Sequence, residues 1–119
     1  MQNYKDLIVW KKAHELVLFV YKLTVAYPKV EQFSLTAQLR RAAISIPANV
    51  AEGCGKYTQS DLANYLQTAL GSSNEVEYLL FRSRELGYLK DDSYKDLGLQ
   101  VNEVRAMLIS LIGKVRKKS

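Results

Sequence analysis

The stretch SLTAQLRRAAISIPANVAEGCG, residues 34–55, decides how this chain folds. Its apolar residues recur at spacings of three and four, which is the period of an α-helix with one buried face. These residues are Leu35, Leu39, Ala42, Ile46 and Val50. Ser34 is expected to cap the first free backbone N–H groups, and Gly53 and Gly55 to stop the helix. The stretch therefore predicts a helix over residues 34–53 with one side in a core.

A proline interrupts the middle of this predicted helix. Pro47 has no backbone N–H, so the bond to the carbonyl of Ala43 is lost and its ring crowds that turn. We therefore expect the helix to be kinked at Pro47, with the freed carbonyls close to Ser45.

A polar stripe runs along the helix beside its apolar face. The members recur at spacings of four, four and three: Arg41, Ser45, Asn49 and Glu52. One interpretation is a binding surface. The other, which we favour, is a covered hydrogen-bond network in which Ser45 and Asn49 satisfy carbonyls released by Pro47 and Arg41 pairs with Glu75. A stripe next to the core tends to be covered by a neighbouring helix or subunit.

The rest of the chain predicts three further helices, over residues 6–27, 60–86 and 92–116. Each carries apolar residues in an alternating three-four pattern, the intervening links are short, and strand-like alternation is almost absent. The small residues 71–73 in the third helix predict a close approach by another helix. The fold class is therefore all-α, an antiparallel up-down four-helix bundle in a single domain spanning residues 1–119.

Composition limits the function. The net charge of +5 makes a polyanion such as RNA an admissible partner. The single cysteine, Cys54, and the single histidine, His14, provide neither a disulfide nor a metal-binding set. No apolar run is long enough for a membrane span and no secretory signal is present, so we expect a cytoplasmic protein.

Four blocks of the sequence carry a family resemblance: YKDLIVWKKAHEL (4–16), FSLTAQLRRAAISIPANVAEGCGK (33–56), ALGSSNEVEYLL (69–80) and ELGYL (85–89). Together they resemble the four-helix bundle protein family, also called the rRNA intervening-sequence protein family. The resemblance implies an up-down bundle that assembles as a ring of five and has no enzymatic activity. Its genes are often inserted in large-subunit rRNA genes, and a related branch accompanies diversity-generating retroelements, binding nucleic acid and a reverse transcriptase.

Catalytic chemistry has little support in the residues. His14 lies on the mostly polar side of the first helix, where a surface role is expected. Cys54 has no second histidine as a partner and fits a small, half-buried thiol better than a nucleophile, although a hydrolase using Cys54 stays an alternative. No glycine-rich loop follows a strand. We expect no enzyme, no cofactor, no metal and no small-molecule substrate.

The leading hypothesis is a homo-oligomeric binding or scaffold protein, a pentamer, that engages RNA or a nucleoprotein through basic residues. In a ring of five, a modest charge per chain is repeated around one rim, where it can bind phosphates by counterion release. The alternative is a structural adaptor that binds only protein partners. The candidate nucleic-acid-binding residues are Lys11, Lys12, Arg40, Lys56, Arg82, Arg84, Lys114, Arg116, Lys117 and Lys118.

Assembly is predicted from apolar residues in excess of one buried stripe per helix. The first and fourth helices carry this surplus, and two different patches are what a ring of heterologous contacts requires. The candidate interface residues are Val9, Leu16, Leu23, Leu99, Ala106 and Ile109.

Overall fold

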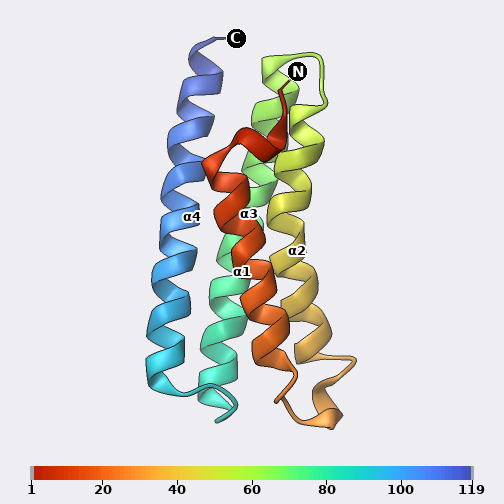
Figure 1. Cartoon of the computed structure of the whole chain (residues 1–119), viewed down its shortest axis with the longest axis vertical. Coiled ribbons are helices and arrows are strands. Elements are labelled where there is room, and N and C mark those ends of the chain that lie inside the picture. The colour runs from red at the N-terminus through yellow and green to blue at the C-terminus, as the bar shows by residue number, and fades with distance from the viewer. Residues whose placement is uncertain (1, 119) are drawn as a thin grey trace.

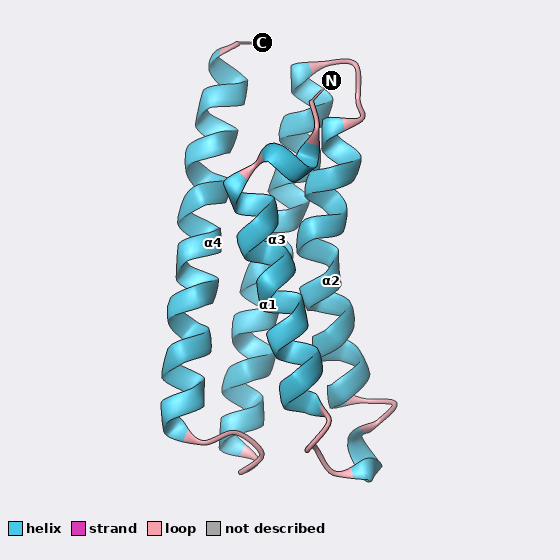
Figure 2. Ribbon diagram, in the orientation of Figure 1, coloured by secondary structure: helices cyan, strands magenta, loops and turns pink. Residues whose placement is uncertain are grey.

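The computed structural model describes residues 2–118, which contain four α-helices, two short 3-10 helices and no strand (Figure 2). The elements are η1 (Tyr4–Asp6), α1 (Ile8–Thr24), η2 (Lys29–Glu31), α2 (Leu35–Cys54), α3 (Gln59–Glu85) and α4 (Asp91–Lys117). The all-helical prediction is confirmed. None of the helices in this described part is long and apolar enough to cross a membrane.

The helices lie side by side in a bundle measuring 45 × 24 × 20 Å (Figure 1). In Figure 1 each helix runs back alongside the one before it, and short links join them at alternate ends. Packing joins α1 to α2, α2 to α3, α3 to α4, and α4 back to α1, which is the most loosely packed of these pairs. The helices therefore surround one central core.

Large aliphatic side chains fill this core from all four helices. Leu16, Leu39, Leu66 and Leu108 are each 0% exposed, one from each helix in chain order. Burial of a leucine contributes about 1.5–3 kcal/mol, so these positions dominate the stability of the bundle. The three-four spacing read from the sequence is thus the spacing of the core.

The start of α2 differs from the prediction. Ser34 makes no side-chain cap; its hydroxyl instead donates to Glu31 Oε1 at 2.6 Å. The same carboxylate oxygen accepts from the Leu35 N–H at 3.4 Å. Glu31 also accepts from the Tyr88 hydroxyl at 3.0 Å, so one acidic side chain links η2, α2 and the α3–α4 link. These bonds, the one from Ser34 above all, lower the pKa of Glu31.

The other helix ends follow from local chemistry. Thr58 caps α3, which begins one residue earlier than predicted, by accepting from the Asp61 N–H at 3.0 Å. Gly87 ends α3 with φ +81°, the left-handed conformation that glycine adopts without strain. The helix α1 is shorter than predicted, because Leu7 is extended and separates it from η1.

Two glycines show where helices approach closely. A Cβ atom on Gly53 would lie 2.9 Å from Tyr65 Cβ and 3.0 Å from Leu62 Cδ1, so only glycine permits this α2–α3 contact. A Cβ on Gly71 would meet nothing within 4 Å. The predicted close approach is therefore wrong at Gly71, but it holds at the next residue, where Ser72 Oγ lies 2.8 Å from Ser45 Oγ of α2.

Pro47 lies inside α2, which continues unbroken from Leu35 to Cys54. Its ring is buried. The kink expected at this residue stays a prediction.

Candidate nucleic-acid interface

The fold separates the predicted basic residues into groups. One group gathers where α4 ends, beside the α2–α3 link and η1 (Figure 1). We call it the basic end; its cationic residues are Lys5, Lys56, Lys114, Arg116, Lys117 and Lys118. The acidic residues at this end are fewer: Asp6, Glu52 and Asp61. Lys5 was not predicted, because in sequence it is an isolated charge far from the others.

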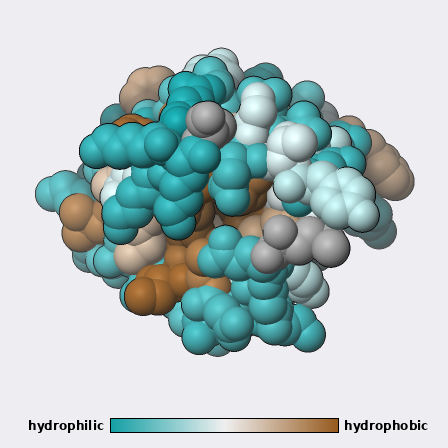
Figure 3. All heavy atoms as spheres, turned by 90° about the horizontal axis from the view of Figure 1, so that it is seen from above, coloured by the Kyte–Doolittle hydropathy of each residue, from teal (hydrophilic) through white to brown (hydrophobic). Residues whose placement is uncertain are grey.

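The basic end is a mostly hydrophilic surface, as Figure 3 shows from above, with apolar side chains in the hollow between the charged ones. Lys114, Lys117 and Lys118 are exposed. Lys56 lies with its Nζ 5.1 Å from the centre of the Tyr65 ring, a cation–π contact. Arg116 donates to Gln67 Oε1 at 2.5 Å, which links α4 to α3. The geometry thus presents several cations at one end of the molecule.

Arg40, in contrast, is tied to its own bundle. Its Nε donates to Thr24 Oγ1 at 2.8 Å, its Nη2 donates to the Tyr21 carbonyl at 3.3 Å, and its guanidinium lies 4.5 Å from the Tyr21 ring centre. The side chain joins α2 to the end of α1. Arg40 therefore has a structural role, and its part in binding nucleic acid stays a prediction.

Two other predicted cations have partners within the chain. Lys12 Nζ lies 3.4 Å from Glu103 Oε1, which joins α1 to α4. Arg84 lies over the Tyr94 ring at 4.6 Å and forms a salt bridge with Glu85 at 3.2 Å. Arg82, like Arg84, is at the opposite end from the basic end, and Lys11 is exposed on α1. The ten predicted residues do not form one surface.

The polar stripe of α2 is only half covered. Ser45 Oγ lies 2.8 Å from Ser72 Oγ on α3, and the Asn49 amide donates to the Ser45 carbonyl at 2.8 Å. Asn49 thus binds a carbonyl two residues beyond the one that Pro47 releases. Arg41 and Glu75 are both exposed, and in the described part of the chain they form no salt bridge with each other. The predicted Arg41–Glu75 pair is therefore wrong.

Glu52, the last member of the stripe, is exposed too. The stripe as a whole is a network at Ser45 and Asn49 with charged ends in solvent.

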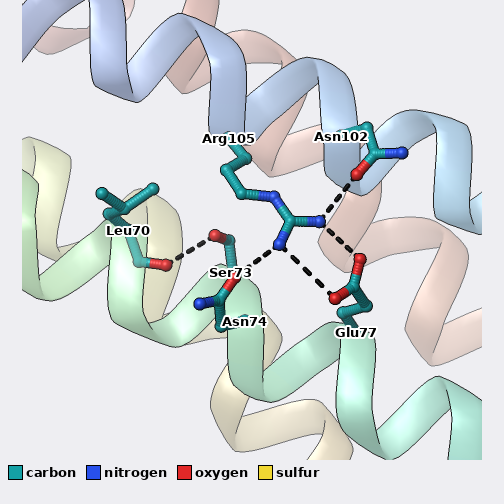
Figure 4. A network of polar contacts seen from close by, with 6 residues as sticks. All are labelled: Leu70, Ser73, Asn74, Glu77, Asn102 and Arg105. Atoms are coloured by element: carbon teal, nitrogen blue, oxygen red, sulfur yellow. Dashed lines mark hydrogen bonds and ion pairs between the residues drawn. The ribbon is translucent and has the colours of Figure 1, made fainter.

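Sequence reasoning missed a polar cluster between α3 and α4 (Figure 4). Arg105 Nη2 donates to Glu77 Oε2 at 2.5 Å and to Asn102 Oδ1 at 2.7 Å, and its Nη1 donates to Asn74 Oδ1 at 2.5 Å. The signal in the sequence is the three-residue spacing of Asn74 and Glu77 on one helix and of Asn102 and Arg105 on the next. This cluster joins helices and leaves the guanidinium no excess charge for a ligand.

Catalytic and metal sites gain no support. Cys54 is 2% exposed and burial raises the pKa of its thiol, which disfavours the reactive thiolate. His14 is exposed and stacks on Trp10, with ring centres 5.2 Å apart. No group of three or more metal-ligating side chains occurs within residues 2–118.

The model of one protein family matches residues 5–110, nearly the whole chain. It describes the 23S rRNA-intervening sequence protein. The chain belongs to this family. Its resemblance to the rRNA intervening-sequence proteins is thereby confirmed, and no curated protein matches the chain.

A solved member of the S23 ribosomal protein family has the same fold as this chain. It is a protein of unknown function from Bacteroides thetaiotaomicron, 26% identical to this chain, with a TM-score of 0.82. The alignment covers 89% of this chain and 96% of the other.

The candidate interface residues of this family member divide into two classes. Val9 and Leu16 are 5% and 0% exposed in the single chain, and Leu23 is partly buried against the core. The predicted patch on α1 is therefore wrong at Val9 and Leu16, because both side chains belong to the core of the bundle. On α4 the exposed candidates are Leu99, Ala106 and Ile109.

Proposed function

We propose that this protein is a non-enzymatic, homo-oligomeric scaffold that binds RNA or a nucleoprotein through its basic end, in the cytoplasm. The proposed unit is an antiparallel up-down bundle with α2 bent at Pro47, assembled as a ring of five. The observation that carries the proposal is the gathering of Lys56, Lys114, Lys117 and Lys118 at one end of the bundle.

Electrostatics supports this choice of surface. A protein that neutralises phosphates releases condensed counterions, and its affinity falls as salt rises. The basic end has more cations than acids, whereas the residues around the α3–α4 link at the opposite end mix cations and acids equally: Arg82, Arg84 and Lys90 with Glu85, Asp91 and Asp92. In a closed ring, the basic ends of all subunits lie on the same rim. Oligomerisation therefore multiplies a patch that would be weak in one chain.

The test is RNA binding measured by fluorescence anisotropy over a series of salt concentrations. The full chain is compared with a variant carrying Lys114→Gln, Lys117→Gln and Lys118→Gln. We expect the slope of log affinity against log salt to fall by about 2–3, since each lost phosphate contact removes roughly 0.7–0.9 from it.

The matched control replaces three exposed lysines away from the basic end: Lys22→Gln, Lys90→Gln and Lys95→Gln. This variant has the same change in net charge and should keep the wild-type slope. Equal losses in both variants would show that net charge alone, and not the basic end, governs binding.

Exposed apolar side chains favour the second candidate, an adaptor that binds only proteins. Leu99 is 68% exposed and Ile109 is 56% exposed on α4, while Ile8 is 63% exposed on α1. In the ring proposal these residues form the contacts between subunits. In the adaptor proposal they are free to bind another protein, and RNA affinity is absent at all salt concentrations.

A further inference from the structure

The link between α2 and α3 presents an aromatic ring to solvent at the basic end. Tyr57, in the middle of this link, is 94% exposed, more than any other large apolar or aromatic side chain in residues 2–118. Figure 1 places the link at the same end of the bundle as the last turn of α4. A ring held this far from the core adds little to the stability of its own fold. It is therefore available to a partner.

The Tyr57 ring and its hydroxyl have no partner among residues 2–118. They make no hydrogen bond, aromatic contact or cation–π contact in this part of the chain. The neighbouring cation, Lys56, lies over Tyr65 instead, with its Nζ 5.1 Å from the ring centre. Tyr4, in η1, has an edge contact with Trp10, with ring centres 5.0 Å apart. Tyrosines near Tyr57 in the fold thus have ring partners, whereas Tyr57 has both of its faces open.

The backbone on either side of Tyr57 is fixed. Before it, the Lys56 N–H donates to the Gly53 carbonyl at 3.1 Å. After it, the Thr58 hydroxyl caps α3 by accepting from the Asp61 N–H at 3.0 Å. Tyrosine has only two side-chain torsions to immobilise, so a ring on a fixed backbone loses little conformational freedom when a partner binds. Tyr57 is therefore a suitable platform for a flat ligand.

The cations of the basic end lie within reach of a chain that crosses this ring. Lys56 directly precedes Tyr57, and Arg116 of α4 donates to Gln67 of α3. Gln67 follows the first residue of α3, Gln59, by eight positions, which is about 12 Å along the helix axis at 1.5 Å per residue. The last turn of α4, with its exposed lysines, is thereby held beside the first turns of α3. A nucleotide chain with one base on Tyr57 can place neighbouring phosphates on these cations.

Polar side chains beside the ring suit the edge of a base. Gln2, Thr58 and Gln59 line a notch of about 40 Å³ together with Tyr57. Both glutamines are exposed, and each amide can donate and accept hydrogen bonds. The notch is too small to enclose a base, so a base would lie on the ring with its edge toward these amides.

We propose that the basic end binds single-stranded rather than duplex RNA, with an unpaired base stacked on Tyr57 and the adjacent phosphates on the lysines. This inference rests on the proposed function, because it names the form of RNA that the same surface binds. Inside a duplex both faces of each base are covered by the stack, so the tyrosine would find no base face. On a single strand, stacking on an aromatic side chain strengthens binding to any sequence.

Fluorescence anisotropy with a labelled oligouridylate of about eight nucleotides tests the inference over the same salt series. We expect Tyr57→Ala to weaken binding at least about fivefold, and by the same factor at every salt concentration, because stacking releases no counterions. An oligomer of the same length that lacks bases should bind wild type and Tyr57→Ala equally. Tyr57→Phe keeps the ring and should bind the oligouridylate like wild type.

The matched control is Phe33→Ala. Phe33 is also aromatic and 88% exposed, but it lies between η2 and α2, at the opposite end of the bundle. Its removal should leave the affinity for the oligouridylate unchanged. Tyr57→Ala should keep the melting temperature and the assembled mass of wild type, since its ring has no partner within the described chain.

Four results would overturn the inference. Equal affinity of wild type and Tyr57→Ala, with the salt slope still reduced in the triple lysine variant, would do so and leave the RNA surface standing. Tighter binding of a duplex of the same length than of the single strand would do the same. A lower assembled mass of Tyr57→Ala in light scattering would assign the ring to a subunit contact. Absence of binding by wild type at low salt would overturn the inference and the proposed function together.

Discussion

The α2–α3 contact and the α1–α4 contact are built from different side chains. Between α2 and α3, Gly53 lies against Tyr65, and Ser45 bonds to Ser72 across the helices. Buried Ala43 and Ala69 are of the same small kind. Small side chains let two helix backbones approach closely, so this contact is closed along its length.

Between α1 and α4 the packing is open at both ends. One groove of about 260 Å³ is lined by residues that include Phe19, Leu23 and Leu97. A second, of about 530 Å³, is lined mainly by apolar residues of which Ile8 and Met107 are examples. These two helices are the most loosely packed neighbouring pair.

The difference indicates which side of the bundle buries its apolar surface within a single chain. The closed α2–α3 contact already buries its apolar atoms. The open α1–α4 contact leaves Ile8 and Phe19 63% and 52% exposed. Exposed apolar surface of this kind is commonly covered by another protein surface. We therefore expect the α1 and α4 side to carry the contacts between subunits.

The largest effect should separate core from interface on these two helices. Leu16→Lys places a charge at a site that is 0% exposed and should destabilise the chain by at least about 3 kcal/mol. Ile109→Lys alters a side chain that is 56% exposed and should leave the fold intact. Thermal unfolding followed by circular dichroism measures both.

Light scattering then tests the interface with the Ile109→Lys variant. Five chains of 13.5 kDa give about 67.5 kDa for the wild type, and the added charge should lower that mass while the helix signal is retained. A wild-type mass near 13.5 kDa at micromolar concentration would defeat the ring.

The closed contact is tested by two glycine substitutions. Gly53→Val places a side chain against Tyr65 and Leu62, and should lower the free energy of unfolding by about 1–3 kcal/mol. Gly71→Ala adds a methyl group where nothing lies within 4 Å, and should stabilise the helix by about 0.5–1 kcal/mol. Urea unfolding measures both. Equal effects of the same sign would mean that α2 and α3 are not closed at Gly53.

Pro47→Ala tests whether α2 is bent at this residue and whether the neighbouring helices pack against the bent form. The residue is buried on the side of α2 that faces the other helices. We expect the free energy of unfolding to fall by about 1–2 kcal/mol. Side chains that pack against a bent α2 would lose contacts if the helix straightened, and the unfolded chain would gain conformational freedom. A variant that melts at a higher temperature and assembles normally would contradict this.

The smallest effect concerns Glu31, which links the helices at the end opposite the basic end. Its pKa is lowered in the folded chain, chiefly by the Ser34 hydroxyl, so its contribution is present above the ordinary pKa of 4.5 and is lost as pH falls through the folded value. Thermal melts over a pH series should show Glu31→Gln less stable than wild type near neutrality, with the difference vanishing in acid. A constant difference at every pH would exclude the ionised carboxylate as its cause.

Much of the site was beyond prediction from the sequence. Lys114, Lys117 and Lys118 lie within one short stretch of the chain, so their cluster was predictable. The contact of Arg40 with Thr24 was not predictable, because the sequence does not distinguish an arginine that binds a neighbouring helix from one that faces solvent. The Arg105 cluster depends on two helices being in register, which spacing within either helix does not specify.

The sequence by itself determined the helices, most core positions and the family, because a three-four apolar period matches an α-helix with one buried face and the blocks from 33 to 56 and from 69 to 80 are distinctive. Only the tertiary structure decided which surplus apolar residues are core. Leu16 and Ile109 both lie off the main stripe in sequence, yet the first is enclosed by neighbouring helices and the second is not. The physical reason is that burial depends on the distance and rotation between helices. Those are set by pairs such as Gly53 and Tyr65, whose contact no single stretch of sequence contains.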